Sequence, residues 1–250
     1  MFEQKTAWIT GAASGIGRAT AIEFAEKGAQ VVVSDVNVAG GEETVEMIEK
    51  AGGKAVFIKC DVSKAEVVVA TVKAIVDQFG SLDIGVNNAG IGGPFIPTAE
   101  YDHESYRQVM AVNLDGVFFC MQEEIKQMLK QGSGAIVNIS SIAGMRGLPR
   151  ASAYSASKHA VIGLTKAASL EYARHKVRIN AVCPVFTRSA MFDSMFMIDP
   201  TYEEKLKKAI PMRRYGQPED IAHAITWLCS DQAGFVTGMC MPMDGGMTAG

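Results

Sequence analysis

Tyr154 and Lys158 stand four residues apart in a stretch of helical periodicity, so their side chains share one face of the predicted helix. A tyrosine is a poor base near neutral pH because its ordinary pKa is about 10, but a nearby ammonium group favours the phenolate and lowers that value. Tyr154 could then exchange a proton with a substrate hydroxyl or carbonyl. Taken alone, the pair is also typical of a solvated helix face, so other segments have to decide between the two interpretations.

A glycine cluster near the N-terminus has the spacing GxxxGxG, formed by Gly11, Gly15 and Gly17. The N-terminus of a helix favours phosphate because it offers unpaired N–H donors and the positive end of the helix dipole. Glycine allows a sharp turn and a close approach of the backbone. A purely structural turn is the alternative, but the position between a predicted strand and a predicted helix favours a loop that holds a pyrophosphate.

Asp35 ends the second predicted strand, 18 residues after Gly17. A carboxylate at this position can accept hydrogen bonds from both hydroxyls of an adenosine ribose, and it would repel a 2′-phosphate. A cation at position 14 or 36 could neutralise that phosphate, but these positions hold the uncharged residues Ser14 and Val36. The sequence therefore predicts NAD rather than NADP, with Arg18 as the nearest competing cation and a surface aspartate without a ligand as the alternative.

Short β-branched runs alternate with longer segments of helical periodicity. We expect strands at Thr6–Thr10, Val31–Asp35, Ala55–Lys59, Ile84–Asn87, Ala135–Ile139, Arg178–Cys183 and near Met239–Met241, and helices at Ile16–Lys27, Gly41–Ala51, Ala65–Phe79, Ser105–Lys130, Ser152–Tyr172 and Pro218–Ser230. This alternation is typical of βαβ units, and right-handed crossovers then give an α/β fold, a Rossmann-type doubly wound parallel sheet of about seven strands with helices on both faces. Because there is no linker or repeat, we expect one domain over residues 1–250, with a Met- and Phe-rich substrate lid at 186–210.

Composition excludes several classes of protein. The net charge of −3 argues against an electrostatic nucleic-acid binder, which would present a basic face. No stretch of 18 or more apolar residues could span a membrane, and the N-terminus lacks the pattern of a signal peptide. The five cysteines are scattered in apolar runs, as expected of buried thiols in a reducing compartment. The four histidines have no partner at metal-ligand spacing, so we predict no metal site. We expect a soluble cytoplasmic protein.

The motifs together carry a resemblance to a known family. The phosphate loop, Asn88-Ala89-Gly90, Asn113, Ser140-Ser141 and the Tyr154/Lys158 pair resemble, in order and spacing, the short-chain dehydrogenases/reductases. The resemblance extends from Thr6 to Gly246. It implies an NAD(P)-dependent oxidoreductase that transfers a hydride between the cofactor and a secondary alcohol or ketone.

The resemblance also implies the roles of individual residues. The catalytic residues would be Asn113, whose main chain positions a relay water, Ser141, which binds the substrate oxygen, Tyr154 and Lys158. Ser140 is the alternative serine, but strand alternation should point it the other way. The cofactor would be bound by Gly11, Ser14, Ile16, Gly17, Asp35, Asp61, Val62, Asn88, Ala89, Tyr154, Lys158, Val185 and Thr187.

One segment departs from the family pattern. Val185 follows Pro184 where the family usually has glycine, and Ser189 stands where threonine is usual. We expect Val185 to narrow the pocket beside the nicotinamide. Further residues flank the catalytic segments and are plausible pocket residues: Gly92, Gly93, Phe95, Met145 and Leu148. In the lid, Met191, Phe192, Met195, Phe196 and Met197 would form either an adaptable apolar wall or core filler.

The leading interpretation is an NAD-dependent secondary-alcohol dehydrogenase, or ketone reductase in reverse, for a hydrophobic small molecule. Alternatives are a 3-oxoacyl-carrier-protein reductase, which generally favours NADPH and is disfavoured by Asp35, a nucleotide sensor without turnover, and a dehydratase or epimerase. The family resemblance also implies a homotetramer packed through 105–130, 152–172 and the C-terminal strand.

Overall fold

The computed structural model describes residues 1–187 and 201–249. Its elements, with short 3-10 and π-helical turns written as η, are β1 (Thr6–Thr10), α1 (Gly15–Glu26), β2 (Gln30–Asp35), α2 (Val38–Lys50), β3 (Lys54–Lys59), α3 (Ala65–Phe79), β4 (Ile84–Asn87), η1 (Thr98–Glu100), α4 (His103–Met110), η2 (Ala111–Asp115), α5 (Gly116–Gln131), β5 (Gly134–Ile139), η3 (Ile142–Gly144), α6 (Ser152–Tyr172), η4 (Ala173–His175), β6 (Val177–Pro184), α8 (Thr201–Ala209), α9 (Pro218–Cys229), η5 (Asp231–Ala233) and β7 (Cys240–Met243). Within these ranges seven parallel strands form one sheet in the order β3-β2-β1-β4-β5-β6-β7. This order confirms the predicted doubly wound fold.

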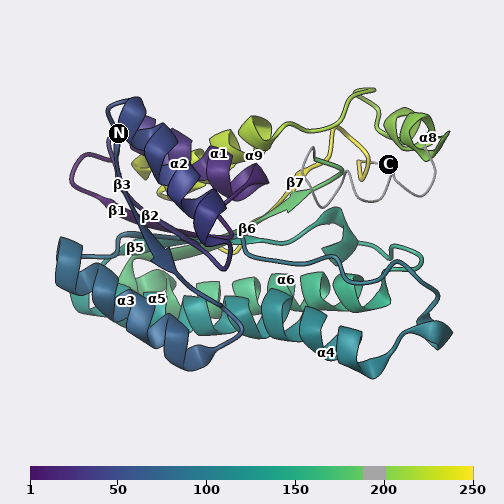
Figure 1. Cartoon of the computed structure of the whole chain (residues 1–250), viewed down its shortest axis with the longest axis horizontal. Coiled ribbons are helices and arrows are strands. Elements are labelled where there is room, and N and C mark those ends of the chain that lie inside the picture. The colour runs from purple at the N-terminus through teal and green to yellow at the C-terminus, as the bar shows by residue number, and fades with distance from the viewer. Residues whose placement is uncertain (188–200, 250) are drawn as a thin grey trace.

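Helices cover both faces of the sheet (Figure 1). One face carries α1, α2 and α9, and the other carries α3, α5 and α6, with α4 packed beside α6. The helices α1 and α9 pack closely, and the Thr226 hydroxyl donates a hydrogen bond to Glu23 Oε1 at 2.7 Å. The first and last helices of the described chain therefore support each other.

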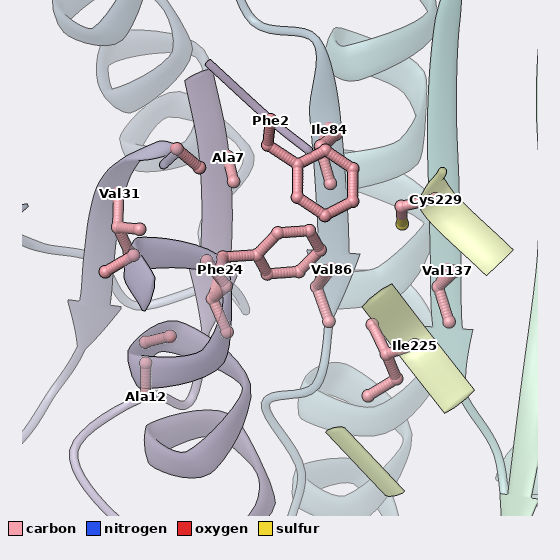
Figure 2. Packing of buried hydrophobic residues seen from close by; sticks show 14 of the residues in the cluster. Phe2, Ala7, Ala12, Phe24, Val31, Ile84, Val86, Val137, Ile225 and Cys229 are labelled. Carbon is pink, nitrogen blue, oxygen red and sulfur yellow. The ribbon is translucent and has the colours of Figure 1, made fainter. Parts of the chain in front are cut away.

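Side-chain alternation along β1 builds the two halves of the core. Ile9 belongs to the apolar cluster under α1 and α9, whereas Trp8 belongs to the cluster under α3. In the first cluster the rings of Phe2 and Phe24 lie 5.0 Å apart, and Ile225 of α9 reaches toward β4 and β5 (Figure 2). Both faces of β1 are buried, which explains why the central strands read as nearly continuous apolar runs.

Local hydrogen bonds place two element boundaries at other residues than the sequence periodicity predicts. The helix α2 begins at Val38 rather than Gly41, because Asn37 Oδ1 accepts a hydrogen bond from the Gly40 N–H at 3.2 Å and caps the first turn. The strand β7 covers Cys240–Met243, slightly beyond its expected position, since it continues to pair with β6 up to Pro184.

The expected helix 105–130 is wrong as a single element. Two α-helices, α4 and α5, flank the π-helical turn η2. A π turn holds an extra residue, and such turns often occur at functional sites. Here Asn113 in η2 forms two hydrogen bonds with the backbone of Ile91, through its side-chain oxygen (2.8 Å) and nitrogen (2.9 Å). The extra residue of the π turn thus occurs where Asn113 is hydrogen-bonded to a loop that is distant in the sequence.

The expected lid at 186–210 is described only at its two ends. Phe186 and Thr187 follow β6, and α8 covers Thr201–Ala209. The remaining predicted lid residues lie outside the described part: Ser189, Met191, Phe192, Met195, Phe196 and Met197. In the described ranges no helix is long and apolar enough to cross a membrane.

Candidate active site

A cleft of about 1240 Å³ opens at the carboxyl ends of the strands. In doubly wound sheets ligands bind at this edge, where the strand order reverses, here between β1 and β4. Most of the predicted site residues line it: Gly11, Ser14, Ile16, Asp35, Asp61, Val62, Asn88, Ala89, Ser141, Tyr154, Lys158, Val185 and Thr187, with Gly92, Gly93, Phe95 and Leu148. Gly17, Asn113 and Met145 do not. The placement of Met145 in the pocket is wrong because this side chain turns outward after η3 and is 41% exposed.

The glycines of the first loop permit close packing against the turn after β4. Gly11 has φ +65°, and a Cβ there would lie 2.8 Å from the Cα of Ala89. A Cβ on the buried Gly17 would overlap the carbonyl oxygen of Gly11. Asn88 Nδ2 donates to the carbonyl oxygens of Thr10 and Gly11, both at 2.9 Å. The amide of Asn88 thus holds the loop in shape from the neighbouring strand.

The loop leads directly into the open end of α1. Ser14 precedes this helix in an extended conformation and forms no side-chain capping hydrogen bond. The first N–H groups of α1 therefore lack a side-chain cap on the wall of the cleft, where Ser14, Gly15 and Ile16 stand. This cradle suits the pyrophosphate of a dinucleotide, because the glycines leave room and the helix end supplies donors.

Asp35 is held at the end of β2 beside this loop. Its carboxylate accepts hydrogen bonds from the N–H of Ala13 (3.0 Å) and of Asn37 (2.9 Å). Arg18 points into the joint between α1 and α2 instead. Its guanidinium donates to Thr44 Oγ1 at 3.0 Å and the Ala13 oxygen at 2.6 Å.

Arg18 also forms an ion pair with Glu43. The competing cation identified in the sequence is therefore neutralised by a carboxylate and engaged in structural hydrogen bonds.

Asp61 and Val62 follow β3 at the same end of the sheet. Asp61 Oδ1 accepts from the backbone N–H and the hydroxyl of Ser63, at 3.0 and 2.7 Å. Val62 is buried and packs against Gly116. Both residues line the same cleft as Asp35 and Asn88.

The two serines after β5 have different environments. Ser140 Oγ donates to the backbone carbonyl oxygen of Lys158 at 2.8 Å. Ser141 Oγ accepts from the Ala143 N–H at 3.1 Å and lies 3.5 Å from the Pro184 carbonyl oxygen, and its hydroxyl acts on Tyr154 to lower the pKa of that phenol. Strand alternation therefore places Ser141, and not Ser140, beside the tyrosine hydroxyl.

Burial dominates the ionisation of Tyr154. It raises the pKa of this phenol above its ordinary value, and the hydrogen bond with Ser141 offsets the rise only in part. The expectation that Lys158 would lower this pKa is wrong for the structure, because desolvation of the phenolate is the larger effect. Tyr154 is thus a protonated hydrogen-bond donor at neutral pH.

Lys158 lies one helical turn further along α6. Its Nζ donates to the carbonyl oxygen of Ile139 at 2.8 Å and lies 5.7 Å from the ring centroid of Tyr154. Burial lowers the pKa of this lysine to about 8. The ammonium group therefore stands close to the tyrosine and has few partners to stabilise its charge.

Asn113 joins the loop after β4 to α6, which carries Tyr154 and Lys158. Besides its bonds to Ile91, its amide nitrogen lies 3.3 Å from Ser157 Oγ on α6. A Cβ on Gly90 would come within 3.2 Å of Asn113 Oδ1 and 3.5 Å of Lys158 Nζ, so Gly90 separates the two side chains. The side chain of Asn113 is committed to structure, which is consistent with a role for its main chain only.

Val185 stands where β6 leaves the sheet. It is not among the described non-glycine residues with positive φ, so no glycine-only conformation is needed here. Its side chain is buried with Ile142, Ile210 and Tyr215 and also lines the cleft. Thr187 Oγ1 donates to the Val185 oxygen at 2.9 Å, which leaves the Thr187 backbone at the cleft edge.

A family model described as enoyl-(acyl carrier protein) reductase matches residues 11–248. The chain belongs to the short-chain dehydrogenase/reductase family. This membership confirms the resemblance carried by the phosphate loop and the Tyr154/Lys158 pair.

Other members of the short-chain dehydrogenase/reductase family match this chain along nearly its whole length. An uncharacterized oxidoreductase of Thermotoga maritima is 46% identical and covers 99% of both chains. The cyclohexanol dehydrogenase of an Acinetobacter species is 43% identical over 99% of this chain and 96% of that protein. The crystal structure of levodione reductase superposes with a TM-score of 0.97 at 36% identity, covering 100% of this chain and 99% of the other. The protein is thus an oxidoreductase that transfers a hydride between a nicotinamide cofactor and a secondary alcohol or ketone.

Sequence reasoning missed several charged and polar residues that line the cleft of this dehydrogenase. Glu104, Arg107 and Gln108 come from α4, and Arg146 follows η3. The only signal available was the helical spacing of Glu104, Arg107 and Ala111, which share one face of the segment before Asn113. No motif distinguishes such residues from an ordinary solvated helix surface.

Proposed function

We propose that this protein is an NAD-dependent reductase of hydrophobic cyclic ketones and dehydrogenase of the corresponding secondary alcohols, with Tyr154 as its acid and base. The observation that carries this proposal is that Ser141, Tyr154 and Lys158 line one cleft together with the glycine loop and Asp35. The names of the relatives, which refer to cyclohexanol and levodione, support a cyclic substrate. The apolar wall of Ile142, Val185 and Phe186 supports a hydrophobic one.

The residues present fit a nicotinamide dinucleotide. The glycine loop and the uncapped end of α1 would hold the pyrophosphate, and Asp35 would accept the adenosine ribose hydroxyls. Asp61 and Val62 would flank the adenine, while Lys158 would hold the second ribose and the Thr187 backbone the carboxamide. When bound, this group supplies or accepts the hydride.

The chain's own residues handle the proton. Ser141 would bind the substrate oxygen and align it with the phenol of Tyr154. Because burial raises its pKa, Tyr154 keeps its proton at neutral pH and can donate it to the oxygen of a ketone during reduction. In alcohol oxidation the same atom must accept a proton, which becomes easier as pH rises.

The test is reduction of cyclohexanone and substituted cyclohexanones, followed as loss of absorbance of the reduced nicotinamide. Wild-type protein should turn over, and Tyr154→Phe should lose activity by about 10²–10⁴-fold while still binding cofactor. If the variant retains wild-type activity, or if the wild type binds cofactor and reduces no ketone, the proposed chemistry is wrong.

Cofactor preference needs its own experiment. Asp35 would repel a 2′-phosphate, and Arg18 is already neutralised by Glu43. We expect kcat/KM to favour NADH over NADPH. Asp35→Ser combined with Val36→Arg should remove the repulsion and supply a cation, which would shift the ratio toward NADPH. A wild-type preference for NADPH would contradict this assignment.

We also propose that copies of the chain assemble through α5 and α6 as a homotetramer. Phe118 and Leu129 of α5 and Leu170 of α6 are exposed large apolar side chains, 41%, 39% and 84% accessible. Soluble chains bury such faces by self-association. Light scattering coupled to size exclusion should give the mass of four chains, and Leu170→Glu should lower it.

A further inference from the structure

Three arginines stand around the part of the cleft that lies beyond Ser141 and Tyr154. Arg146 and Arg150 belong to the loop between η3 and α6, and Arg107 belongs to α4, which packs against α6. Arg107 and Arg146 line the cleft itself. Most of the ion pairs between described residues lie in other parts of the molecule, so ion pairing within the protein does not explain these arginines.

Arg146 comes five residues after the catalytic serine. Its guanidinium Nη2 lies 3.1 Å from the sulfur of Met247, and no carboxylate of the described residues comes within 4.0 Å of it. Met247 packs against the apolar cluster of Ile142, Val185, Ile210 and Tyr215. The cation is therefore exposed at the end of an apolar wall that begins beside Ser141.

The loop that carries Arg146 is anchored at its other end. Arg150 has φ +67°, a left-handed conformation that is unfavourable for a residue with a Cβ. In that conformation its guanidinium lies 5.5 Å from the ring centroid of Phe95, which lines the opposite loop of the cleft. This cation–π contact links the two loops and restricts the position of Arg146.

Arg107 and Glu104 complete the charges at this end. They stand one helical turn apart on α4 and both line the cleft, but they are not within ion-pair distance of each other. Among the described residues the side chain of Arg107 has no acidic partner within 4.0 Å. At this end two arginines and one carboxylate line the cleft, which leaves a net positive charge at its mouth.

We infer that the substrate carries a carboxylate, joined through an apolar body to the carbon that reacts, and that Arg146 binds it with support from Arg107. A guanidinium matches the planar geometry of a carboxylate and can form two parallel hydrogen bonds with it. The apolar body would lie along Ile142 and Val185, between Ser141 and Arg146. This inference rests on the proposed ketone reductase function and specifies its substrate as an oxo acid or hydroxy acid.

The test compares 4-oxocyclohexanecarboxylate with its carboxamide, which has the same shape and no charge. Wild-type kcat/KM should favour the carboxylate by about 5–20-fold at low ionic strength, and salt should reduce that ratio because the arginines are exposed. Arg146→Gln should bring the ratio close to one, and Arg107→Gln should lower it by a smaller factor. Arg174→Gln, at the far end of α6, serves as the matched control and should keep the wild-type ratio.

A second measurement needs no turnover. In the presence of cofactor, cyclohexanecarboxylate should raise the thermal midpoint of the wild type more than the corresponding carboxamide does, and Arg146→Gln should abolish the difference. If ketones are reduced without preference for the carboxylate, or if the preference survives both arginine variants, the inference is wrong and the ketone reductase proposal stands. If no ketone is reduced but the carboxylate still stabilises through Arg146, the anion site stands and the proposed reaction fails.

Discussion

Lys158 Nζ donates a hydrogen bond to the carbonyl oxygen of Ile139 across 2.8 Å, where α6 meets the carboxyl end of β5. The lysine is buried one helical turn after Tyr154 on α6, and this hydrogen bond holds the end of its side chain. Removing its ammonium group from water is costly, so burial lowers its pKa to about 8. The charge that would bind the cofactor ribose is therefore lost within the range of ordinary assays.

Cofactor affinity should depend on the protonation of Lys158. The folded protein loses this proton as pH rises through about 8, so the dissociation constant of the reduced cofactor should increase by about tenfold between pH 7 and 9. Fluorescence titration of the bound cofactor gives this profile. Lys158→Met should bind weakly at every pH and show no such rise. Constant wild-type affinity across this range would refute the assignment.

The two neighbouring serines should differ sharply in their effect on turnover. Ser141→Ala removes the hydroxyl that would bind the substrate oxygen and that lowers the pKa of Tyr154, and it should reduce kcat by about 10–10³-fold with little change in folding. Ser140→Ala is the matched control. It removes a structural hydrogen bond to the carbonyl oxygen of Lys158, so its main effect should be a lower thermal midpoint, with only a small effect on kcat. The reverse pattern would assign the catalytic role to Ser140.

Gly17→Ala should disturb the phosphate loop without touching the cleft surface. The added Cβ would overlap the Gly11 oxygen and crowd Asn88 Nδ2, so the loop has to move. We expect a loss of about 1–3 kcal/mol of stability and at least a tenfold weaker cofactor affinity. Calorimetry and cofactor titration measure the two effects. Wild-type affinity in this variant would show that the close packing of Gly17 is unimportant.

Glu124 is fully buried in α5, and its Oε2 accepts a hydrogen bond from Asn87 Nδ2 at 2.9 Å. Asn87 also donates to Asn138, which in turn donates to Thr165, both at 2.9 Å. Burial raises the pKa of Glu124 from 4.5 to about 8, so this carboxyl is protonated at neutral pH. A polar chain thus connects α5, β4, β5 and α6 beneath the catalytic residues.

The raised pKa of Glu124 makes stability depend on pH. Between pH 4.5 and about 8 the folded state holds a proton that the unfolded state releases, so this group's contribution to stability falls as pH rises. Glu124→Gln keeps the shape and removes the titration. From about pH 6 to about pH 9 the wild-type melting temperature should fall by about 5 °C more than that of the variant. Parallel pH dependence of both proteins would contradict the buried, protonated state.

Val185→Gly tests whether this side chain limits the substrate. Removing it opens the pocket beside Ile142 and should increase kcat/KM for bulkier ring-substituted ketones relative to cyclohexanone. It should also destabilise the protein by about 1–3 kcal/mol, since a buried side chain is lost. An unchanged substrate profile across a panel of ketones would show that Val185 does not shape the pocket.

Local patterns in the sequence were sufficient for the sheet and for most of the cleft. The glycine loop, Asp35 and the Tyr154/Lys158 pair lie at the ends of strands or on one helix face, so their spacing along the chain already predicts their place at the cleft. The π turn at Asn113 was missed because its hydrogen bonds go to Ile91, 22 residues earlier. The high pKa of Tyr154 was missed for a related reason, since burial depends on packing from distant segments. Arg107 and Arg146 reach the cleft only through the tertiary fold.

The contact between Thr226 and Glu23 joins residues 203 positions apart. During synthesis on the ribosome, the face of α1 that packs against α9 therefore stays uncovered until α9 has also emerged. Until then the apolar surface of the nascent βα unit is accessible to chaperones, and the nucleotide cradle at the start of α1 gains its full support only when α9 packs against it.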